Sequence, residues 1–301
     1  MTERISSPQF HLNSLESILD AQRRLARTQA ELASGKRILH PSDDPSASSE
    51  ISEIQTELSK IETYQRNANS VSTELSLTEA AIASVESVVL RAKELAVRGN
   101  NAALSISEKE LISAEVMGLK EQLISISGTK APNGEYLFAG SAVDQPPYTD
   151  VDGTIEYQGD LLKRTVNLGP GVTIESRVIG NEVFGINDNG DVNLFGVLDQ
   201  LSTALTSAGG SQDIGQALDD LDEGLNTVLS ARASVGLRMN RVDDQQSLNE
   251  TFNYTLQETL SGLEDLDYAE AITKLNLQMV ALQAAQQTFT KTQGMSLFNY
   301  M

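Results

Sequence analysis

Apolar residues recur at steps of three, four and seven toward both ends of the chain. Near the N-terminus they are Leu12, Leu15, Ile18, Leu19, Leu25 and Leu32. Near the C-terminus the steps alternate between three and four along Ile272, Leu275, Met279, Leu282, Gln286, Phe289, Gln293 and Ser296. This spacing predicts two amphipathic helices, each with a coiled-coil-like seam. Because such helices draw most of their stability from packing, we expect the two ends to pair, within one chain or across subunits.

The N-terminal pattern stops within LASGKRILHPSDDPS, residues 32–46. Glycine favours a helix end, proline cannot donate a hydrogen bond within a helix, and aspartate accepts hydrogen bonds from free helix amides. We interpret the stretch as a bend between two helices, with Arg37, Asp43 and Asp44 at the joint and both aspartates capping the second helix. It lacks the upstream glycine and the downstream serine or threonine of a phosphate-binding loop, and neighbours in sequence seldom reach the geometry of a catalytic triad.

Two further helices are expected between the bend and residue 128. Helical spacing continues from about residue 46 to Gly99, which predicts an unusually long helix. The next helix is predicted to begin at a capping box formed by Ser107 and Glu110 and to end at Gly128.

The pattern then changes from helix to strand. EYLFAG, residues 135–140, predicts a short strand, and residues 145–190 predict a small acidic antiparallel β unit with glycine-containing turns. Helical spacing returns at 193–208 and again from about 211, and it pauses near residue 262, where Asp265 and Asp267 offer the N-cap of the last helix.

The resulting fold class is mainly α with a small β insertion. We expect a long antiparallel helix bundle whose N- and C-terminal helices pair as a coiled coil. The predicted domains are an N-terminal seam helix (1–45), the first part of the core bundle (46–141), an outward β insertion (142–192), the second part of the bundle (193–264) and a C-terminal seam helix (265–301).

Composition and charge limit the classes of function and partner that suit this chain. The 301 residues are 40% hydrophobic but only 5% aromatic, which favours long, thinly packed helices. The formal net charge is -20, while residues 1–40 carry +2 and residues 265–301 carry -1. This charge disfavours nucleic acid and anionic membranes as partners, and the nearly neutral ends suit surfaces that pack against other proteins. The chain offers no run apolar enough for a cleavable signal peptide or a membrane span.

Little in the sequence indicates chemistry. The chain has no cysteine and only two histidines, His11 and His40, without the spacing of a metal site. NDNGD, residues 187–191, is better interpreted as a turn than as a calcium loop, because its glycine is misplaced. We therefore assign no catalytic, cofactor-binding or metal-binding residues, predict no cofactor, and expect the protein not to be an enzyme.

Two polar features of the sequence can be explained with or without a functional role. Gln22, Gln29, Gln286 and Gln293 follow the terminal helices, where they can be solvated or can form hydrogen bonds between subunits that fix the helix register. Two glycosylation sequons, at Asn249 and Asn253, lie inside a predicted helix, and we interpret them as chance matches.

Three ordered motifs resemble the flagellin superfamily. The stretch LASGKRILHPSDDPSAS is similar to the loop between the first two helices of that superfamily, and its Pro-Ser-Asp-Asp-Pro form resembles the hook-filament junction branch more than the filament flagellins. Residues 88–141 and the C-terminal stretch that begins LEDLDYAEAITKLNLQMVALQ are similar to the core segments of the family. The resemblance covers about residues 1–141 and 230–301.

The resemblance implies a structural protein of the bacterial flagellum that forms an adaptor ring between hook and filament. The implied partners are further copies of this chain, other hook-associated proteins, flagellin, and a flagellar export chaperone at the C-terminal helix. It also implies secretion by type III export without a cleaved signal peptide, so that the protein ends in the extracellular flagellum. We predict that the terminal helices are disordered in the free monomer and become ordered on assembly.

We expect the inner coiled coil to use seven apolar residues as its assembly interface. They are Leu25, Leu32, Ile272, Leu275, Met279, Leu282 and Phe289. The main alternative function is a filament-forming flagellin. A secreted enzyme on a helical scaffold is disfavoured because the insertion has no histidine or cysteine, and a cytoplasmic coiled-coil scaffold would require stable helical ends in the monomer.

Overall fold

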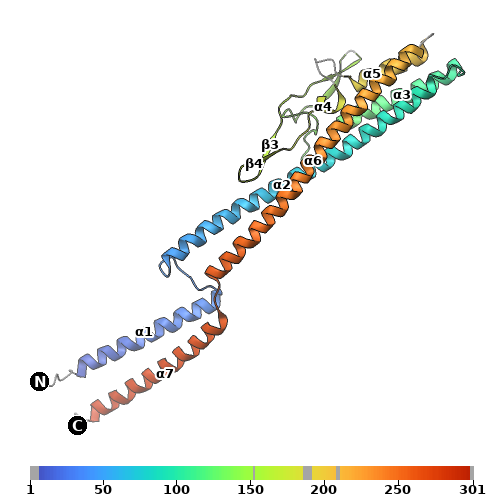
Figure 1. Cartoon of the computed structure of the whole chain (residues 1–301). Coiled ribbons are helices and arrows are strands. Elements are labelled where there is room, and N and C mark those ends of the chain that lie inside the picture. Colours follow the sequence, from blue (N-terminus) through green and yellow to red (C-terminus); the bar gives the residue numbers. More distant parts are fainter. Residues whose placement is uncertain (1–6, 152, 186–191, 208–210, 299–301) are drawn as a thin grey trace. The chain divides into compact units, whose positions relative to one another are not determined.

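A computed structural model of the chain describes residues 7–151, 153–185, 192–207 and 211–298 (Figure 1). The chain forms two compact units. The first, the terminal unit, contains residues 1–60 and 252–301, and the second, the core unit, contains residues 61–251. Two long helices, α2 (Pro45–Gly99) and α6 (Ser211–Glu264), contribute residues to both units.

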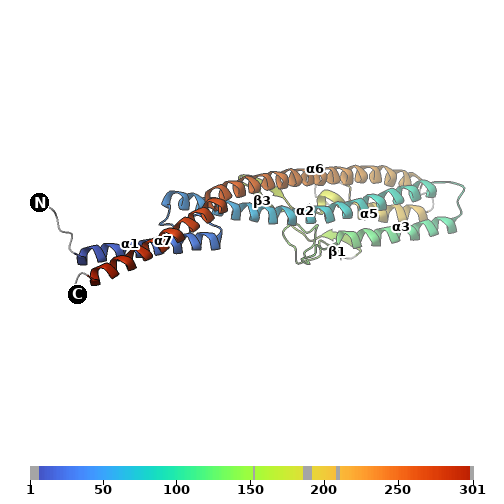
Figure 2. The same cartoon turned by 90° about the horizontal axis from the view of Figure 1, so that it is seen from below.

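In the terminal unit two helices lie side by side. They are α1 (Ser7–Ser34) and α7 (Tyr268–Phe298), and they run in opposite directions (Figures 1 and 2). This arrangement confirms the expected pairing of the N- and C-terminal helices. A small apolar cluster of Ile38, Ala47 and Ile51, with Leu260 and Leu263 against it, packs α2 onto the end of α6.

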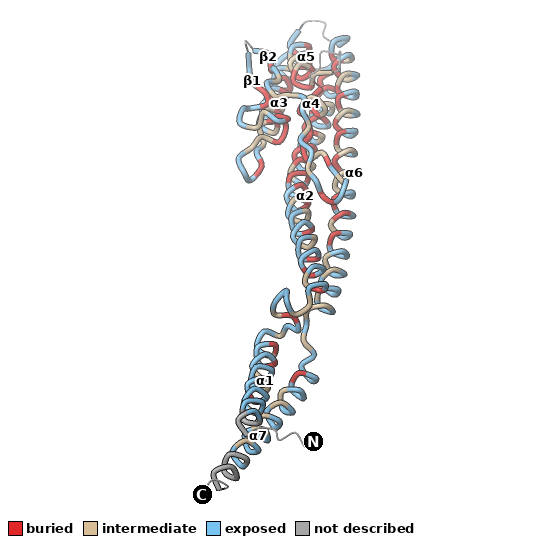
Figure 3. The backbone as a smooth tube through the Cα atoms, turned by 90° about the vertical axis from the view of Figure 1, so that its left-hand side faces the viewer, coloured by how far each residue is buried: buried red, intermediate tan, exposed pale blue. Residues whose placement is uncertain are grey.

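The core unit is a helix bundle. Its helices are α2, α3 (Ile106–Ser127), α5 (Leu194–Thr206) and α6. The apolar residues of these helices are almost fully buried where they face one another, as the red positions in Figure 3 show. Ion pairs cross the bundle at its edges, among them those of Arg232 on α6 with Glu79 and Glu86 on α2.

The predicted β unit is present as two separate antiparallel hairpins. The first pairs β1 (Tyr148–Val151) with β2 (Thr154–Tyr157), and the second pairs β3 (Thr165–Gly169) with β4 (Val172–Glu175). A short helix, α4 (Asn181–Phe184), follows. Aromatic rings fill the space between these elements and α5. The ring centroids of Tyr148, Phe184 and Phe195 lie 5.2 to 5.5 Å apart.

Two local predictions are wrong. The capping box of α3 uses Ser105 and Glu108, not Ser107 and Glu110: the Ser105 side chain accepts from the Glu108 amide, and the Glu108 carboxylate accepts from the Ser105 amide at 2.8 Å. The pattern of serine followed by glutamate three residues later occurs twice in this segment, and the earlier copy is used.

The predicted strand at residues 135–140 does not form. Tyr136 pairs with Lys130 and Ala139 pairs with Ile179, each as an isolated bridge, with a turn between them. Because the two ends of the segment pair with different partners, no continuous ladder develops. The NDNGD stretch, predicted to be a turn, lies outside the described residues.

Candidate assembly surface and helix joint

The contact between α1 and α7 follows alternate steps of four and three along both helices. On α1 the half-buried or buried positions at this spacing are Ser14, Ile18, Ala21, Leu25, Thr28 and Leu32. On α7 they are Ala271, Leu275, Gln278, Leu282, Ala285 and Phe289. We call these residues the α1–α7 seam. It is a thin contact, because only a few of its members are fully buried.

The structure places five of the seven predicted interface residues in this seam. They are Leu25, Leu32, Leu275, Leu282 and Phe289, all half-buried. Ile272 and Met279 lie one position away from it and are 46% and 40% exposed. The small residues Ala271 and Ala285 take the places that the spacing assigned to larger residues. Every second position of the α7 stripe therefore agrees with the seam and the positions between them lie one residue away, while the use of all seven residues in assembly stays a prediction.

Both helices expose apolar side chains on faces turned away from the seam. On α1 these are Leu12, Leu15 and Leu19, between 46% and 66% exposed. On α7 they include Leu277 and Val280, at 67% and 64% exposed, beside Ile272 and Met279. At 3.6 residues per turn, the apolar positions of α7 extend around the whole helix. A helix that is apolar on all sides is typical of a buried environment, which α1 alone does not provide.

The joint begins where α1 ends. Gly35 has φ +73°, and its amide donates to the Glu31 carbonyl at 2.9 Å, which is the left-handed end that glycine favours. The next residues then pair with the connection between α6 and α7: the Arg37 amide donates to the Glu264 carbonyl at 2.8 Å, and the Leu266 amide donates to the Gly35 carbonyl at 3.0 Å. A short antiparallel bridge therefore ties the two connections together.

Side chains reinforce this bridge. Lys36 forms an ion pair with Glu264, and the Arg37 guanidinium donates to the Leu263 carbonyl at 2.9 Å. A guanidinium nitrogen of Arg37 also lies 3.9 Å from a carboxylate oxygen of Asp44. Arg37 thus contacts both the end of α6 and the residue that directly precedes α2.

The two aspartates have different roles. Asp44 caps α2, because its carboxylate accepts from the Ala47 amide at 3.1 Å. Asp43 does not cap the helix, which corrects the sequence interpretation: its carboxylate accepts from the amides of Leu39 and His40 at 3.2 and 3.1 Å and closes the loop before α2. The geometry explains the difference, since Asp44 directly precedes the first residue of α2.

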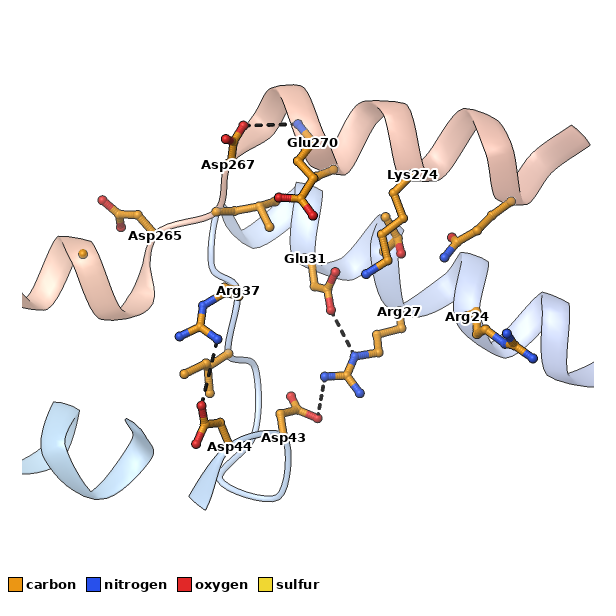
Figure 4. A pocket seen from close by; sticks show the side chains of 16 residues that line it. Arg24, Arg27, Glu31, Arg37, Asp43, Asp44, Asp265, Asp267, Glu270 and Lys274 are labelled. Carbon is orange, nitrogen blue, oxygen red and sulfur yellow. Dashed lines mark hydrogen bonds and ion pairs between the residues drawn. The ribbon is translucent and has the colours of Figure 1, made fainter. Parts of the chain in front are cut away.

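Asp43 is also held by Arg27 of α1. The guanidinium lies 3.0 Å from Asp43 and 3.0 Å from Glu31, so it links the end of α1 to the loop before α2 (Figure 4). The amide of His40 lowers the pKa of Asp43, and the Leu39 amide and the charge of Arg27 act in the same direction against partial burial.

These groups line a groove of about 600 Å³ between the end of α1, the loop before α2 and the start of α7. Figure 4 shows charged side chains of both signs around it, with Arg24 and Lys274 on one side and Asp265 and Asp267 on the other. Asp267 caps α7 by accepting from the amides of Ala269 and Glu270. The arrangement fixes backbone connections, and within the described residues no cluster of histidine and acidic side chains suits a metal ion.

The contacts of several residues in the joint and in the core unit were not predicted from the sequence. Lys36, Arg27 and Glu264 carry ion pairs of the joint, and nothing in their spacing distinguishes them from solvated charges. Asn249, noted only as a sequon, is 2% exposed, and its amide donates to the Leu168 carbonyl at 2.9 Å. Its burial supports the interpretation of the sequon as a chance match. Gln22, Gln29 and Gln286 are exposed in the chain.

Comparison with known proteins adds the decisive observation. The model of the bacterial flagellin N-terminal helical region matches residues 5–143, and the model of the flagellin C-terminal helical region matches residues 218–301, which together make up most of the chain. The chain belongs to the flagellin family. The described part of this flagellin family member contains no helix that is long and apolar enough to cross a membrane.

Relatives that match almost the whole chain include hook-associated proteins. It is 27% identical to flagellar hook-associated protein 3 of Escherichia coli K12 and 26% identical to that of Salmonella typhimurium, each over 98% of both chains. Flagellin of Bacillus subtilis is 22% identical over 91% of the chain. The sequence resemblance to the hook-filament junction branch is thereby confirmed.

Solved structures share the fold. A putative flagellar hook-associated protein from Vibrio parahaemolyticus covers 74% of this chain and 100% of its own, with a TM-score of 0.69 and 23% identity. The flagellar junction protein FlgL from Legionella pneumophila covers 72% of this chain and 100% of its own, with a TM-score of 0.61 and 16% identity.

Proposed function

We propose that this chain is a structural protein of the bacterial flagellum that assembles into an adaptor ring joining hook to filament. The full-length similarity to hook-associated protein 3 supports this role. The structural observation that carries it is the exposed apolar surface of α1 and α7. Within one chain these helices cover only the seam, so their outer faces need further copies or neighbouring flagellar proteins to leave water.

The proposed partners follow from this surface. Copies of the same chain cover one another's terminal helices in the ring, and other hook-associated proteins and flagellin contact the two sides of the ring. Before assembly, an export chaperone binds the apolar faces of α7. The protein reaches the extracellular flagellum through the flagellar export apparatus without a cleaved signal peptide, and it acts mechanically rather than by catalysis.

An adaptor and a filament-forming flagellin differ in how far they polymerise. The chain resembles flagellins less closely than hook-associated proteins, with 20–24% identity to several flagellins. We expect purified chain added to isolated hooks to stop at short assemblies and then to accept flagellin. Long filaments made of this chain alone would instead support the flagellin alternative.

Substitution of exposed apolar residues on α7 tests the surface itself. In Leu277→Ser combined with Val280→Ser, we expect the chain to fold as before, because both side chains are about two thirds exposed in the monomer. The variant should fail to join flagellin filaments to hooks, as measured by electron microscopy of hooks incubated with each chain and flagellin.

A matched control lies in the core unit. Leu161 and Leu162 are 66% and 67% exposed and lie between β2 and β3. Leu161→Ser combined with Leu162→Ser removes a similar amount of exposed apolar surface away from the terminal helices and should retain joining. If both pairs of substitutions reduce joining equally, the terminal surface is not the assembly interface.

A further inference from the structure

A buried arginine links three segments of the core unit that are far apart in the sequence. Arg177, which follows β4, is only 3% exposed. Its guanidinium pairs with Glu135, in the segment that leads into the β hairpins, and lies 3.5 Å from Glu74 on α2. We call these three residues the latch. It joins the entry and the exit of the β insertion to the helix bundle.

Neighbouring polar groups complete the cluster. Asn133 donates its side-chain amide to Glu135 at 2.7 Å, and Arg164 lies 3.8 Å from the same carboxylate. On the other side, Arg238 of α6 donates to the Arg177 carbonyl at 3.1 Å and pairs with Glu175 at 2.9 Å. Glu175 also pairs with Lys163, which pairs with Glu182. These are the charged groups that face the latch from the elements packed around it.

The latch sits beside the backbone contacts that hold the entry and exit segments together. The Gly180 amide donates to the Phe138 carbonyl at 3.0 Å, and Ala139 bridges to Ile179. A buried guanidinium that loses its carboxylate partners is strongly destabilising, because it keeps its charge at any accessible pH. Protonation of Glu135, which pairs directly with this guanidinium, therefore destabilises this part of the structure.

The apolar core of the bundle and the docking contacts of the β3–β4 hairpin do not use ionised groups, although ion pairs also lie at the edges of the bundle. The bundle is held by this apolar core, and that burial does not change with pH. The β3–β4 hairpin is docked by side-chain amides, since Asn67 and Asn249 donate to the carbonyls of Asn167 and Leu168 at 2.9 Å. Neither amide titrates. The contacts around Arg177 thus depend on carboxylate charge, whereas the apolar core and these two amide contacts do not.

We propose that Glu74, Glu135 and Arg177 form an acid-sensitive latch that fastens the entry and exit segments of the β insertion to the helix bundle and opens before the bundle unfolds. Above the ordinary range of carboxyl pKa values the latch is closed. As the pH falls, the two segments separate from α2 while the helices and the β3–β4 hairpin stay in place.

The environment of Glu135 agrees with a latch that is closed at neutral pH and opens in acid. Burial raises its pKa, but hydrogen bonds from Asn133 and Arg177 and the charges of Arg177 and Arg164 outweigh that effect and hold the pKa below its usual range. A lowered folded-state pKa means that the latch contributes stability above the unfolded-state pKa of about 4.3 and loses it as the pH falls through the folded-state value.

Hydrogen exchange of the full chain, measured by mass spectrometry from pH 7 down to about pH 2, below the ordinary carboxyl pKa range, and corrected for intrinsic exchange rates, tests the proposal. We expect protection in residues 130–141 and 176–181 to fall at least tenfold in acid, while residues 68–96 and 214–242 keep theirs. Arg177→Met should show open segments already at pH 7. If the segments and the bundle lose protection at the same pH, the latch does not exist.

Two further variants sharpen the test. Asn133→Asp leaves all three latch residues in place but sets a second carboxylate beside Glu135, so opening should move to higher pH. An unchanged profile would overturn the proposal even where Arg177→Met does not fold. The control is Lys120→Met, which removes the 2.6 Å ion pair with Asp199 between α3 and α5. It should weaken the bundle without changing the pH at which the segments open.

Discussion

Gly35 occupies a position in the joint that other residues cannot take without strain. Its φ is +73°, and a Cβ added there would lie 2.8 Å from the Tyr268 hydroxyl. Gly35→Ala should therefore lower the free energy of unfolding by about 1–2 kcal/mol, mainly through the left-handed backbone. Urea unfolding followed by circular dichroism measures this change.

The matched control for this substitution is Gly262. It lies within α6, also lines the joint groove, and has nothing within 4 Å of an added Cβ. Alanine there should be neutral or should stabilise by up to about 1 kcal/mol, because glycine is a poor helix former. Equal losses in both variants would show that Gly35 is not under a special backbone constraint.

Asp43 gives the joint a pH dependence of known sign. Its pKa is lowered, first by the His40 amide and further by the Leu39 amide and Arg27. Its interactions therefore stabilise the joint above the unfolded-state pKa of about 3.9 and are lost as the pH falls through the folded-state value. Asp43→Asn should be less stable than the parent at pH 7, and the difference should shrink in acid.

Thermal unfolding of the two chains between pH 7 and about pH 3 checks this expectation. Arg27→Met should show part of the same loss, because Arg27 is the cation that contacts Asp43. A stability difference between Asp43→Asn and the parent that does not vary with pH would mean that the carboxylate charge has no role in the joint.

The helices themselves followed closely from the sequence. The apolar spacing located α1, α2, α6 and α7, because a repeat sustained over many turns has few alternatives. Its phase on α7 was harder to predict. Ile272 and Met279 complete a three-four pattern with Leu275 and Leu282. Ala271 and Gln278 complete an equally regular pattern with the same two leucines, and it is this second pattern that is buried against α1. A rule that places the largest apolar residues in the nearest contact therefore fails on α7, where Ile272 and Met279 are exposed in the single chain.

Local polar contacts were less predictable than helical faces. Asp43 and Asp44 are chemically equivalent neighbours, and only the position of the first residue of α2 decides which of them caps it. The buried ion pairs of Arg177 join it to Glu135 and to Glu74, which is more than a hundred residues away, and the sequence carries no periodicity that links them. Such contacts depend on tertiary structure, whereas the bend at residues 32–46 is encoded locally by glycine and proline.

The start of α3 allows a direct test of cap register. Ser105→Ala removes the side chain that accepts from the Glu108 amide and should cost about 1 kcal/mol of stability. Ser107→Ala changes the serine that the sequence pattern selected, which is exposed within the first turn of α3, and should be nearly neutral. Urea unfolding of the two variants distinguishes the registers, and a larger loss for Ser107→Ala would restore the later capping box.

On the scale of the whole molecule, burial is distributed unevenly. The core unit holds a continuous apolar core, whereas α1 and α7 bury fully only Ile18, Thr28, Glu31 and Ala271 among their described side chains. Helices stabilised by so little packing are marginal. The terminal helices are therefore expected to gain most of their stability from the copies that surround them in the ring, in a coupled ordering and binding step.

This difference predicts how the free and assembled chains exchange amide hydrogens. In the purified monomer, residues 9–34 and 268–291 should exchange far faster than residues 68–96 of the core unit, because local opening costs little where few apolar contacts are broken. In assemblies on isolated hooks the same terminal residues should become protected, while the core unit changes little. Strong protection of both ends in the monomer would mean that the α1–α7 seam is sufficient by itself. The exposed leucines would then have to act in docking between preformed helix pairs, and ordering of the ends would no longer be the step that controls assembly.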